Sequence, residues 1–318
     1  MSDSTLLLAV DGGGTKTEAV IADLEGNILG RGFGPGSNPY SVGFARFGDA
    51  VSAAVENALR GVLGPTPAGP AWGAARFAAA CFGMAGVDSP EDEAQVSCWV
   101  REQAVAPSFL VVNDAELILA AGTPDGTGVV LISGTGSICL GRSADGRTAR
   151  VGGWGTLISD EGSGYDVGLR ALRFAARAFD GRAEAPALLE AALTHFSLPA
   201  IPALMRHLHE PTTSPAEIAG FAPVVLDLAS KGDGPAGEIR EAAARELACH
   251  VRAVVRRLGL RRPTLAMAGG LLRGDLRRSL LCLIADEVGA CNYVEDPVLG
   301  GVRLARRLLH GPPQRQAP

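Results

Sequence analysis

A pattern that occurs twice in the chain constrains its fold more than any other feature. The first copy starts with the apolar run at residues 6–10, passes through "DGGGT" into a second apolar stretch, and reaches a third after the turn "DLEGN". From residue 127, "TGVVLISGTGSICLGRSADGRTARVGG" repeats this order of strand, small-residue turn, strand, Asp-Gly turn and strand. When Asp11–Thr15 is aligned with Ser133–Ser137, the loops and the later turns coincide to within about two residues. Two copies of one module predict two related lobes.

The segments around the two copies predict an α/β chain. Apolar residues recur at helical spacing over residues 43–62, and the strand-like "ARFAAACFGMAG" is followed by a charged helix ending near Arg101 and by the strand "FLVVND" at 109–114. Beyond residue 165 amphipathic spacing predicts helices over 166–179, 216–230 and 237–258, before the strand and glycine turn of "RRPTLAMAGGLL" and the helix of "DPVLGGVRLARRLL". The tail "GPPQRQAP" is predicted to be disordered. We therefore expect an N-terminal lobe over 1–118 and a C-terminal lobe with a helical insertion over 119–296.

Charge and cysteine usage exclude several classes of partner. The formal net charge is −5 with acidic and basic residues interspersed, so neither a nucleic-acid footprint nor a membrane-surface patch is expected. No apolar run has the length of a membrane span. The six cysteines form no C-x-x-C pair, which argues against a zinc site or a disulfide framework and favours a reducing, cytoplasmic environment. A small-molecule partner is expected instead.

The glycine loops are candidates for phosphate binding, because glycine lets backbone N–H groups approach an anion closely. Taken alone, "DGGGT" fits an ordinary hairpin turn equally well. Two related loops favour a clamp on the β- and γ-phosphates of a nucleotide, with hydroxyl donors added by the flanking residues. The candidates are Gly13, Gly14, Thr15, Ser133, Gly134, Thr135, Gly136 and Ser137. Lys16 is placed either to reach a phosphate or to stay in solvent.

The motifs together resemble a known family. "AVDGGGTKTEAVIAD" and "LISGTGS" are similar to the two phosphate loops of the actin-like ATPase fold. With "SNPY", "GMAGVD", "NDA" and "VGGWGTLISDEGSGYDVG", they resemble the N-acetylglucosamine kinase branch of the BadF/BadG/BcrA/BcrD-type ATPases. The resemblance is dense over residues 6–170. It implies a two-lobed actin-like fold of duplicated βββαβαβα modules around a nucleotide cleft, with a helix at 297–312 returning to the first lobe.

The same resemblance implies the reaction and its cofactors. The expected activity is ATP-dependent phosphorylation of an amino sugar with Mg²⁺, most simply N-acetylglucosamine to its 6-phosphate, with glucosamine as the alternative acceptor. A homodimer is also expected, since it is common in such folds.

Two aspartates are candidates for the chemistry. Asp114 lies where a buried strand gives way to a helix, a frequent position for ligand contacts in α/β sheets, and it fits either a general base or a helix N-cap. Beside the paired loops we favour the base, which would take the proton of the sugar hydroxyl. Asp11 ends the first strand and suits Mg²⁺ held through water, although an Asp-Gly turn would also explain it.

The segment 152–164 is the candidate sugar site, because it combines an aromatic ring with polar groups and glycines. By resemblance Asn38, Gly153, Trp154 and Asp160 match sugar-contacting positions, and Gly155 and Glu161 are further candidates, beside Asp114 itself. Trp154 also fits core packing, and the two carboxylates also fit capping of the helix that begins near Tyr165. On the adenosine side, Gly269 and Gly270 match by resemblance, with Ala219 nearby.

A function of another class is also found in this wider family: an ATPase that activates an iron–sulfur dehydratase or reductase. Such proteins hold a cluster through cysteines at a dimer interface. Here Cys81, Cys139 and Cys282 lie in apolar runs, where a thiol is normally a small hydrophobe, so the sugar kinase is favoured.

Overall fold

The computed structural model describes residues 6–64 and 77–310, which form two compact units. One unit runs to Gly126 and resumes at Val294, and the other is Thr127–Tyr293. The chain thus passes from the first unit to the second after Gly126, whereas the sequence analysis placed this boundary after residue 118. The predicted disordered tail at 311–318 lies outside the described residues.

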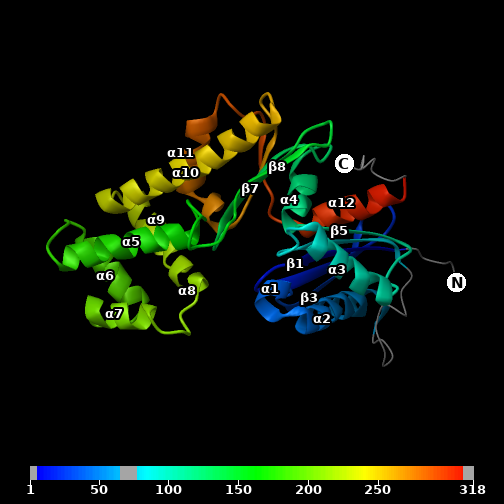
Figure 1. The fold of residues 1–318 in the computed structure, drawn as a ribbon, viewed down its shortest axis with the longest axis horizontal. Helices are drawn as coiled ribbons and strands as arrows, with labels where there is room; N and C mark the ends of the chain where they lie inside the picture. Colours follow the sequence, from blue (N-terminus) through cyan, green and yellow to red (C-terminus); the bar gives the residue numbers. More distant parts are fainter. Residues whose placement is uncertain (1–5, 65–76, 311–318) are drawn as a thin grey trace. The chain divides into compact units, whose positions relative to one another are not determined.

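Figure 1 shows the elements of each unit. The first unit contains β1 (Leu6–Gly12), β2 (Lys16–Ala22), β3 (Ile28–Pro35), α1 (Pro39–Val42), α2 (Phe44–Leu63), β4 (Phe77–Met84), α3 (Pro90–Glu102), β5 (Ser108–Val112), α4 (Asp114–Gly122) and α12 (Val298–Leu308). The second contains β6 (Gly128–Ser133), β7 (Ser137–Arg142), β8 (Thr148–Gly152), α5 (Gly164–Phe179), α6 (Pro186–His195), α7 (Ile201–Leu208), α8 (Pro215–Ala219), α9 (Ala222–Ser230), α10 (Gly234–Leu258), β9 (Leu265–Ala268), the 3₁₀ helix η2 (Gly270–Arg273), α11 (Asp275–Ile284) and β10 (Cys291–Tyr293).

The two sheets have the same topology. In the first, the order is β3-β2-β1-β4-β5, where β1 is antiparallel to β2 and parallel to β4. In the second, read in the matching direction, the order is β8-β7-β6-β9-β10, where β6 is antiparallel to β7 and parallel to β9. The strand ends make Gly12 the counterpart of Ser133, one residue away from the alignment made on the sequence. The repeat in the sequence is therefore a repeat of the fold.

The first sheet is covered by helices on both faces. Leu6, Leu8 and Val10 of β1 pack with α2 and α3, whereas Leu7 and Ala9 pack with α4 and α12. This alternation explains why the strand reads as a continuous apolar run. The predicted closing helix is α12, and Gly300 allows it to approach α4 closely, since a Cβ there would lie 1.8 Å from the carbonyl oxygen of Leu117.

The second unit differs by its helices. The predicted helix at 216–230 is divided into α8 and α9 around Gly220 and Phe221, and Phe221 is fully buried there. Helices α5, α9 and α10 pack together over the face of β6 that carries Val129 and Leu131. Within the described ranges, no helix is both long and apolar enough to cross a bilayer.

Three glycines of β3 bring this strand against α2. Gly30, Gly32 and Gly34 alternate along the strand and so share one face, where a Cβ would meet the backbone of α2. The clash would be most severe at Gly32, where a Cβ would lie 2.1 Å from the backbone nitrogen of Ala58 and 2.3 Å from the carbonyl oxygen of Ala54.

We predict that Gly32→Ala lowers the free energy of unfolding by about 1–3 kcal/mol, because strand and helix must separate to admit the methyl group. Gly61→Ala is the matched control, since a Cβ there meets open space on α2, and it should raise stability by up to about 1 kcal/mol. Urea denaturation of both variants measures this difference. Equal effects of the two substitutions would contradict the packing account.

Candidate active site

The carboxyl end of the first sheet brings together the predicted Asp11 and Asp114. Strands β1, β4 and β5 are parallel neighbours, so the residues that end β1 and follow β5 meet at one edge. Burial first, and then the carboxylates of Asp114 and Glu18, raise the pKa of Asp11 to about 7, while the charge of Lys16 acts to lower it. A partly buried carboxyl group with such an environment is suited to a cation.

Asp114 does not cap its helix. The N-cap of α4 is Asn113, whose Oδ1 accepts the N–H of Ala115 at 3.0 Å, while Asp114 occupies the first helical position. Burial raises the pKa of Asp114 to about 6, and a hydrogen bond from the Ala115 N–H opposes the rise. This value leaves Asp114 mostly ionised at neutral pH, as a general base must be.

The loop that follows β4 holds the remaining polar groups of this edge. Asn113 donates to Asp88 at 3.0 Å, and a Cβ on Gly86 would lie 2.7 Å from Oδ1 of Asn38. Asn38 is the N-cap of α1 and accepts the N–H of Tyr40 at 3.0 Å. The structure thus places Asn38 beside the loop that contacts Asn113, and assigns its side-chain oxygen a capping role.

The first glycine loop projects from the same edge. Gly14, Thr15 and Lys16 are exposed, and the N–H of Gly13 closes the turn on the carbonyl of Lys16 at 2.9 Å. Below the loop, Gly12 packs against the side chains of Met84 and Ser37. A Cβ there would lie 2.1 Å from Cε of Met84 and 2.5 Å from Oγ of Ser37, so both side chains would have to shift to admit it.

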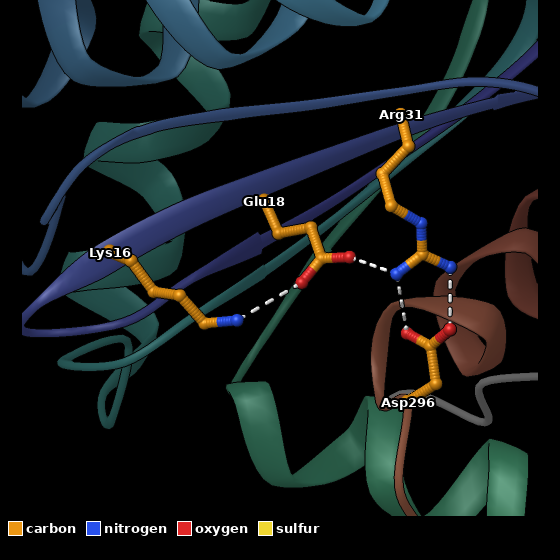
Figure 2. Close-up of polar contacts among 4 residues, drawn as sticks. All are labelled: Lys16, Glu18, Arg31 and Asp296. Atoms are coloured by element: carbon orange, nitrogen blue, oxygen red, sulfur yellow. Dashed lines mark hydrogen bonds and ion pairs between the residues drawn. The ribbon is translucent and has the colours of Figure 1, made fainter.

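Lys16 begins a chain of ion pairs that the sequence analysis missed. Its ammonium group lies 3.3 Å from Glu18, and Glu18 in turn contacts the guanidinium group of Arg31 (Figure 2). Arg31 also binds both carboxylate oxygens of Asp296, at 3.2 and 2.5 Å. Glu18 in an otherwise apolar strand was the available signal, whereas Asp296, 265 residues from Arg31, gave none.

The second glycine loop lies at the end of β6, with Thr135 exposed at its tip. The hydroxyls of Ser133 and Ser137, expected to face a phosphate, instead donate to the carbonyls of Gly162 and Glu161, at 2.9 and 2.8 Å. Both serines are buried and hold the 160–162 segment in place. The N–H of Gly134 is also engaged, because it donates to the carbonyl of Gly136 at 2.9 Å. The groups left for an anion here are the exposed hydroxyl of Thr135 and the backbone N–H of Gly136.

Asp160 has the features of a functional residue. It is buried and has a left-handed backbone with φ +67°, a conformation that non-glycine residues rarely adopt. Its carboxylate accepts the N–H of Ser137 at 3.1 Å, and burial raises its pKa above the usual value. Helix α5 is capped by Ser163, so neither Asp160 nor Glu161 serves as the cap.

Trp154 is exposed rather than part of the core. Its side chain is 63% exposed, and Arg150 lies over its ring at 4.9 Å. Positive φ angles at Gly153 and Gly155 bracket it, and Leu157 and Ile158 in the same segment are also exposed. Exposed apolar side chains on a glycine-rich loop are typical of a ligand contact surface.

Residues predicted on the adenosine side lie near the second glycine loop. A Cβ on Gly269 would lie 2.2 Å from the carbonyl oxygen of Ser133, and Gly269 has φ +99°. Gly164 is packed closely here: a Cβ on it would lie 3.0 Å from the carbonyl oxygen of Gly134 and 3.1 Å from Cβ of Ala219. Gly270 begins η2, where a Cβ would meet open space.

A buried histidine lies next to the 152–164 segment. His250 of α10 is buried, and its Nε2 lies 3.7 Å from a carboxylate oxygen of Glu161. Burial lowers the pKa of His250, and the nearby carboxylates of Glu161, Glu246 and Asp160 oppose that shift. It supports the segment from the helix side.

Comparisons with known proteins agree with these features. The chain matches the model of the BadF/BadG/BcrA/BcrD ATPase family over residues 8–301. It is 34% identical over 307 residues to an N-acetylmuramic acid/N-acetylglucosamine kinase of Clostridium acetobutylicum, a match that covers 94% of this chain and 98% of the relative. It is 32% identical over 311 residues to an N-acetyl-D-glucosamine kinase of Dictyostelium discoideum, covering 94% and 97%. A solved structure from Chromobacterium violaceum, assigned as an N-acetylglucosamine kinase, has a TM-score of 0.75 at 27% identity and covers 95% of this chain and 99% of that one.

We predict that Asp11 makes stability fall as pH rises. Between the ordinary pKa of 3.8 and the raised value of about 7, the folded chain keeps a proton that the unfolded chain has lost, so ionisation favours unfolding. We compare the melting temperature of Asp11→Asn with that of wild type in the absence of divalent cations. The difference, variant minus wild type, should increase by at least about 2 °C from pH 5 to pH 8.

Thermal denaturation across this pH range measures the effect. Glu25→Gln, a change at an exposed carboxylate of the same unit, is the matched control and should track wild type at every pH. A constant offset between Asp11→Asn and wild type would contradict the raised pKa.

Proposed function

Because the chain belongs to the BadF/BadG/BcrA/BcrD ATPase family, we propose that it transfers the γ-phosphoryl group of ATP to the 6-hydroxyl of N-acetylglucosamine. The predicted fold class is confirmed: two five-stranded sheets of the same topology form the fold of the actin-like ATPases and sugar kinases. The chain is an ATP-dependent sugar kinase of this family. The acceptor, the product and the residue roles are our proposals.

The observation that carries the proposal is the environment of Asp114. It follows a parallel strand beside Asp11, is free of capping duty, and has a pKa of about 6. A phosphoryl transfer to an alcohol needs one group that accepts the hydroxyl proton, together with positioning and charge stabilisation. Asp114 would take that proton while the sugar oxygen bonds to the γ-phosphorus and ADP leaves.

We assign phosphate contacts to the two glycine loops. In the first loop the exposed Gly14, Thr15 and Lys16 supply backbone N–H groups, a hydroxyl and a positive charge, and in the second Thr135 supplies a hydroxyl. Asp11 would hold Mg²⁺ through water, since Lys16 is the one cation among the described residues that acts to lower the pKa of its carboxyl group. When bound, Mg²⁺ supplies charge neutralisation on the phosphates.

We assign sugar contacts to Asn38 and to the segment that carries Trp154 and Asp160. The exposed indole of Trp154 offers an apolar face, and the carboxylate of Asp160 can accept hydrogen bonds from sugar hydroxyls. Asn38 keeps its amide nitrogen to donate to an acceptor, since its oxygen caps α1. Ser133 and Ser137 act as positioning residues for Asp160 and Glu161 through their hydrogen bonds to that segment.

Two other acceptors are tested by the same assay. Glucosamine is the alternative acceptor that the sequence suggests, and the name of the Clostridium relative adds N-acetylmuramic acid.

We also propose a cytoplasmic location, because all six cysteines are free thiols.

The iron–sulfur activator is disfavoured by the cysteines. Cys81 and Cys139 are fully buried, and burial raises the pKa of both thiols, which makes them poor cluster ligands. Cys282 is exposed on α11, although its apolar run led us to expect a small hydrophobe there. Within the described ranges, no group of three or more histidine, cysteine or acidic side chains could hold a metal.

We predict that Asp114→Asn lowers kcat by about 10²-fold or more, because an amide cannot accept the hydroxyl proton. A coupled ADP-release assay with ATP and Mg²⁺ measures this for N-acetylglucosamine, glucosamine, N-acetylmuramic acid, N-acetylmannosamine, glucose and a sugar-free blank. The KM for ATP should stay within about threefold of wild type, since Asp114 contacts the acceptor rather than the nucleotide.

Glu102→Gln, an exposed carboxylate of α3, is the control for this assay and should retain wild-type turnover. ATP hydrolysis at a rate that no sugar changes would contradict the kinase proposal. Glucosamine or N-acetylmuramic acid as the best acceptor would replace the named substrate and keep the reaction class.

We predict that Trp154→Ala raises the KM for the sugar about tenfold and leaves the KM for ATP unchanged, because the indole is assigned to the acceptor alone. Met205→Ala is the control, since this apolar side chain is 51% exposed on α7 of the same unit, outside the segment assigned to the sugar. A fall in kcat with both KM values unchanged would contradict a role for Trp154 in sugar binding.

A further inference from the structure

A concave site lies in the C-terminal unit, between α5 and α10. The cavity has a volume of ≈ 740 Å³, within the range of pockets that hold small molecules. Its walls are formed by residues 170–177 of α5 and 237–245 of α10, and none of the residues assigned to ATP or sugar lines it. It is therefore separate from the proposed active site.

The cavity is positively charged, although the whole chain carries a formal charge of −5. Guanidinium groups line both walls: Arg170, Arg173 and Arg177 on α5, and Arg240 and Arg245 on α10. The two carboxylates of the lining are Glu238 and Glu241. A concave surface lined by one sign of charge focuses its field and raises the local concentration of opposite charge.

Several of these charged groups are already engaged. Arg170 pairs with Asp166 at 2.8 Å, and Asp166 also accepts the N–H of Gly162 at 2.9 Å. Glu241 binds Arg240 at 3.1 Å and accepts the hydroxyl of Ser279 at 2.8 Å. These groups form a fixed frame around the cavity.

Arg173 on one wall and Arg245 on the other do not take part in these ion pairs. Among the residues that the structure describes, neither Arg173 nor Arg245 forms an ion pair or a side-chain hydrogen bond, and both are exposed. Phe174 adds an aromatic surface to the cavity lining, with the guanidinium group of Arg177 at 5.7 Å from its ring centroid. The planar guanidinium group, with five donors, matches the oxygens of a phosphate group in a bidentate manner.

We propose that this cavity binds a phosphorylated small molecule, clamped between Arg173 of α5 and Arg245 of α10. The ligand is either inorganic phosphate or a phosphate ester whose organic part contacts Phe174. Binding here is independent of the phosphoryl-transfer reaction, and so of the proposed function.

The test is titration calorimetry of the full chain, in the absence of ATP, with inorganic phosphate and with N-acetylglucosamine 6-phosphate at constant ionic strength. Arg173→Gln with Arg245→Gln should weaken binding of at least one probe about tenfold or more, since each guanidinium group contributes charged hydrogen bonds. Only the binding that this double variant loses is assigned to the cavity, because the ester is also the proposed product of the active site. If the lost binding is tighter for the ester than for inorganic phosphate, the ester is the ligand, and if it is equal or weaker for the ester, free phosphate is the ligand.

The matched control is Arg256→Gln with Arg261→Gln, which removes the same charge from exposed positions of the same unit outside the cavity. This control should bind as wild type does, within about twofold. Equal weakening in both double variants would reduce the effect to general charge attraction and overturn the proposal, as would the absence of saturable binding by wild type.

Sedimentation of the same variants without phosphate distinguishes a surface between copies of the chain. If Arg173→Gln with Arg245→Gln changes the oligomeric state and leaves phosphate binding intact, the cavity belongs to an interface and the proposal is overturned. Because no step of the test uses turnover, its failure is distinguishable from failure of the kinase proposal.

Discussion

The structure depends on two glycines at the carboxyl ends of parallel strands, one in each unit. In the first unit, Gly12 lies against Met84 and Ser37, and in the second, Gly269 lies against the carbonyl of Ser133. At each of these points a Cβ would overlap a neighbouring atom by more than an ordinary contact allows. Gly269 meets backbone and has φ +99°, so glycine is required there, whereas at Gly12 the side chains of Met84 and Ser37 would have to move to admit a Cβ.

The two modules use this constraint differently. In the first, the loop 13–15 and the neighbouring carboxyl group of Asp11 stand at the edge with an exposed lysine, which is held through Glu18 and Arg31 to Asp296. In the second, the serines that flank the loop are buried and hold the segment 160–162. One topology therefore supports a charged loop in one unit and a loop that anchors a neighbouring segment in the other.

Local sequence patterns predicted most of the fold. The repeat, the apolar strand of residues 6–10 and the helix at 43–62 follow from periods that the backbone itself imposes. Contacts between distant residues were not predictable in this way. The pairing of Arg31 with Asp296, the break between α8 and α9 at Phe221, and the engagement of the Ser133 hydroxyl all depend on tertiary packing. In the candidate site, residue types were predictable from motifs, whereas Asn113 rather than Asp114 as the cap of α4 required the structure.

Three carboxyl groups in the candidate site have raised pKa values, and burial is the first cause for each. Desolvation of Asp11, Asp114 and Asp160 costs folding free energy whenever they ionise, and for Asp160 the left-handed backbone adds strain. Neither cost is offset by a salt bridge within the part of the chain that the structure describes, whereas Glu18 and Asp166 each have an arginine partner. Carboxyl groups kept in such positions are typical of functional sites, where a bound ligand would favour their charge.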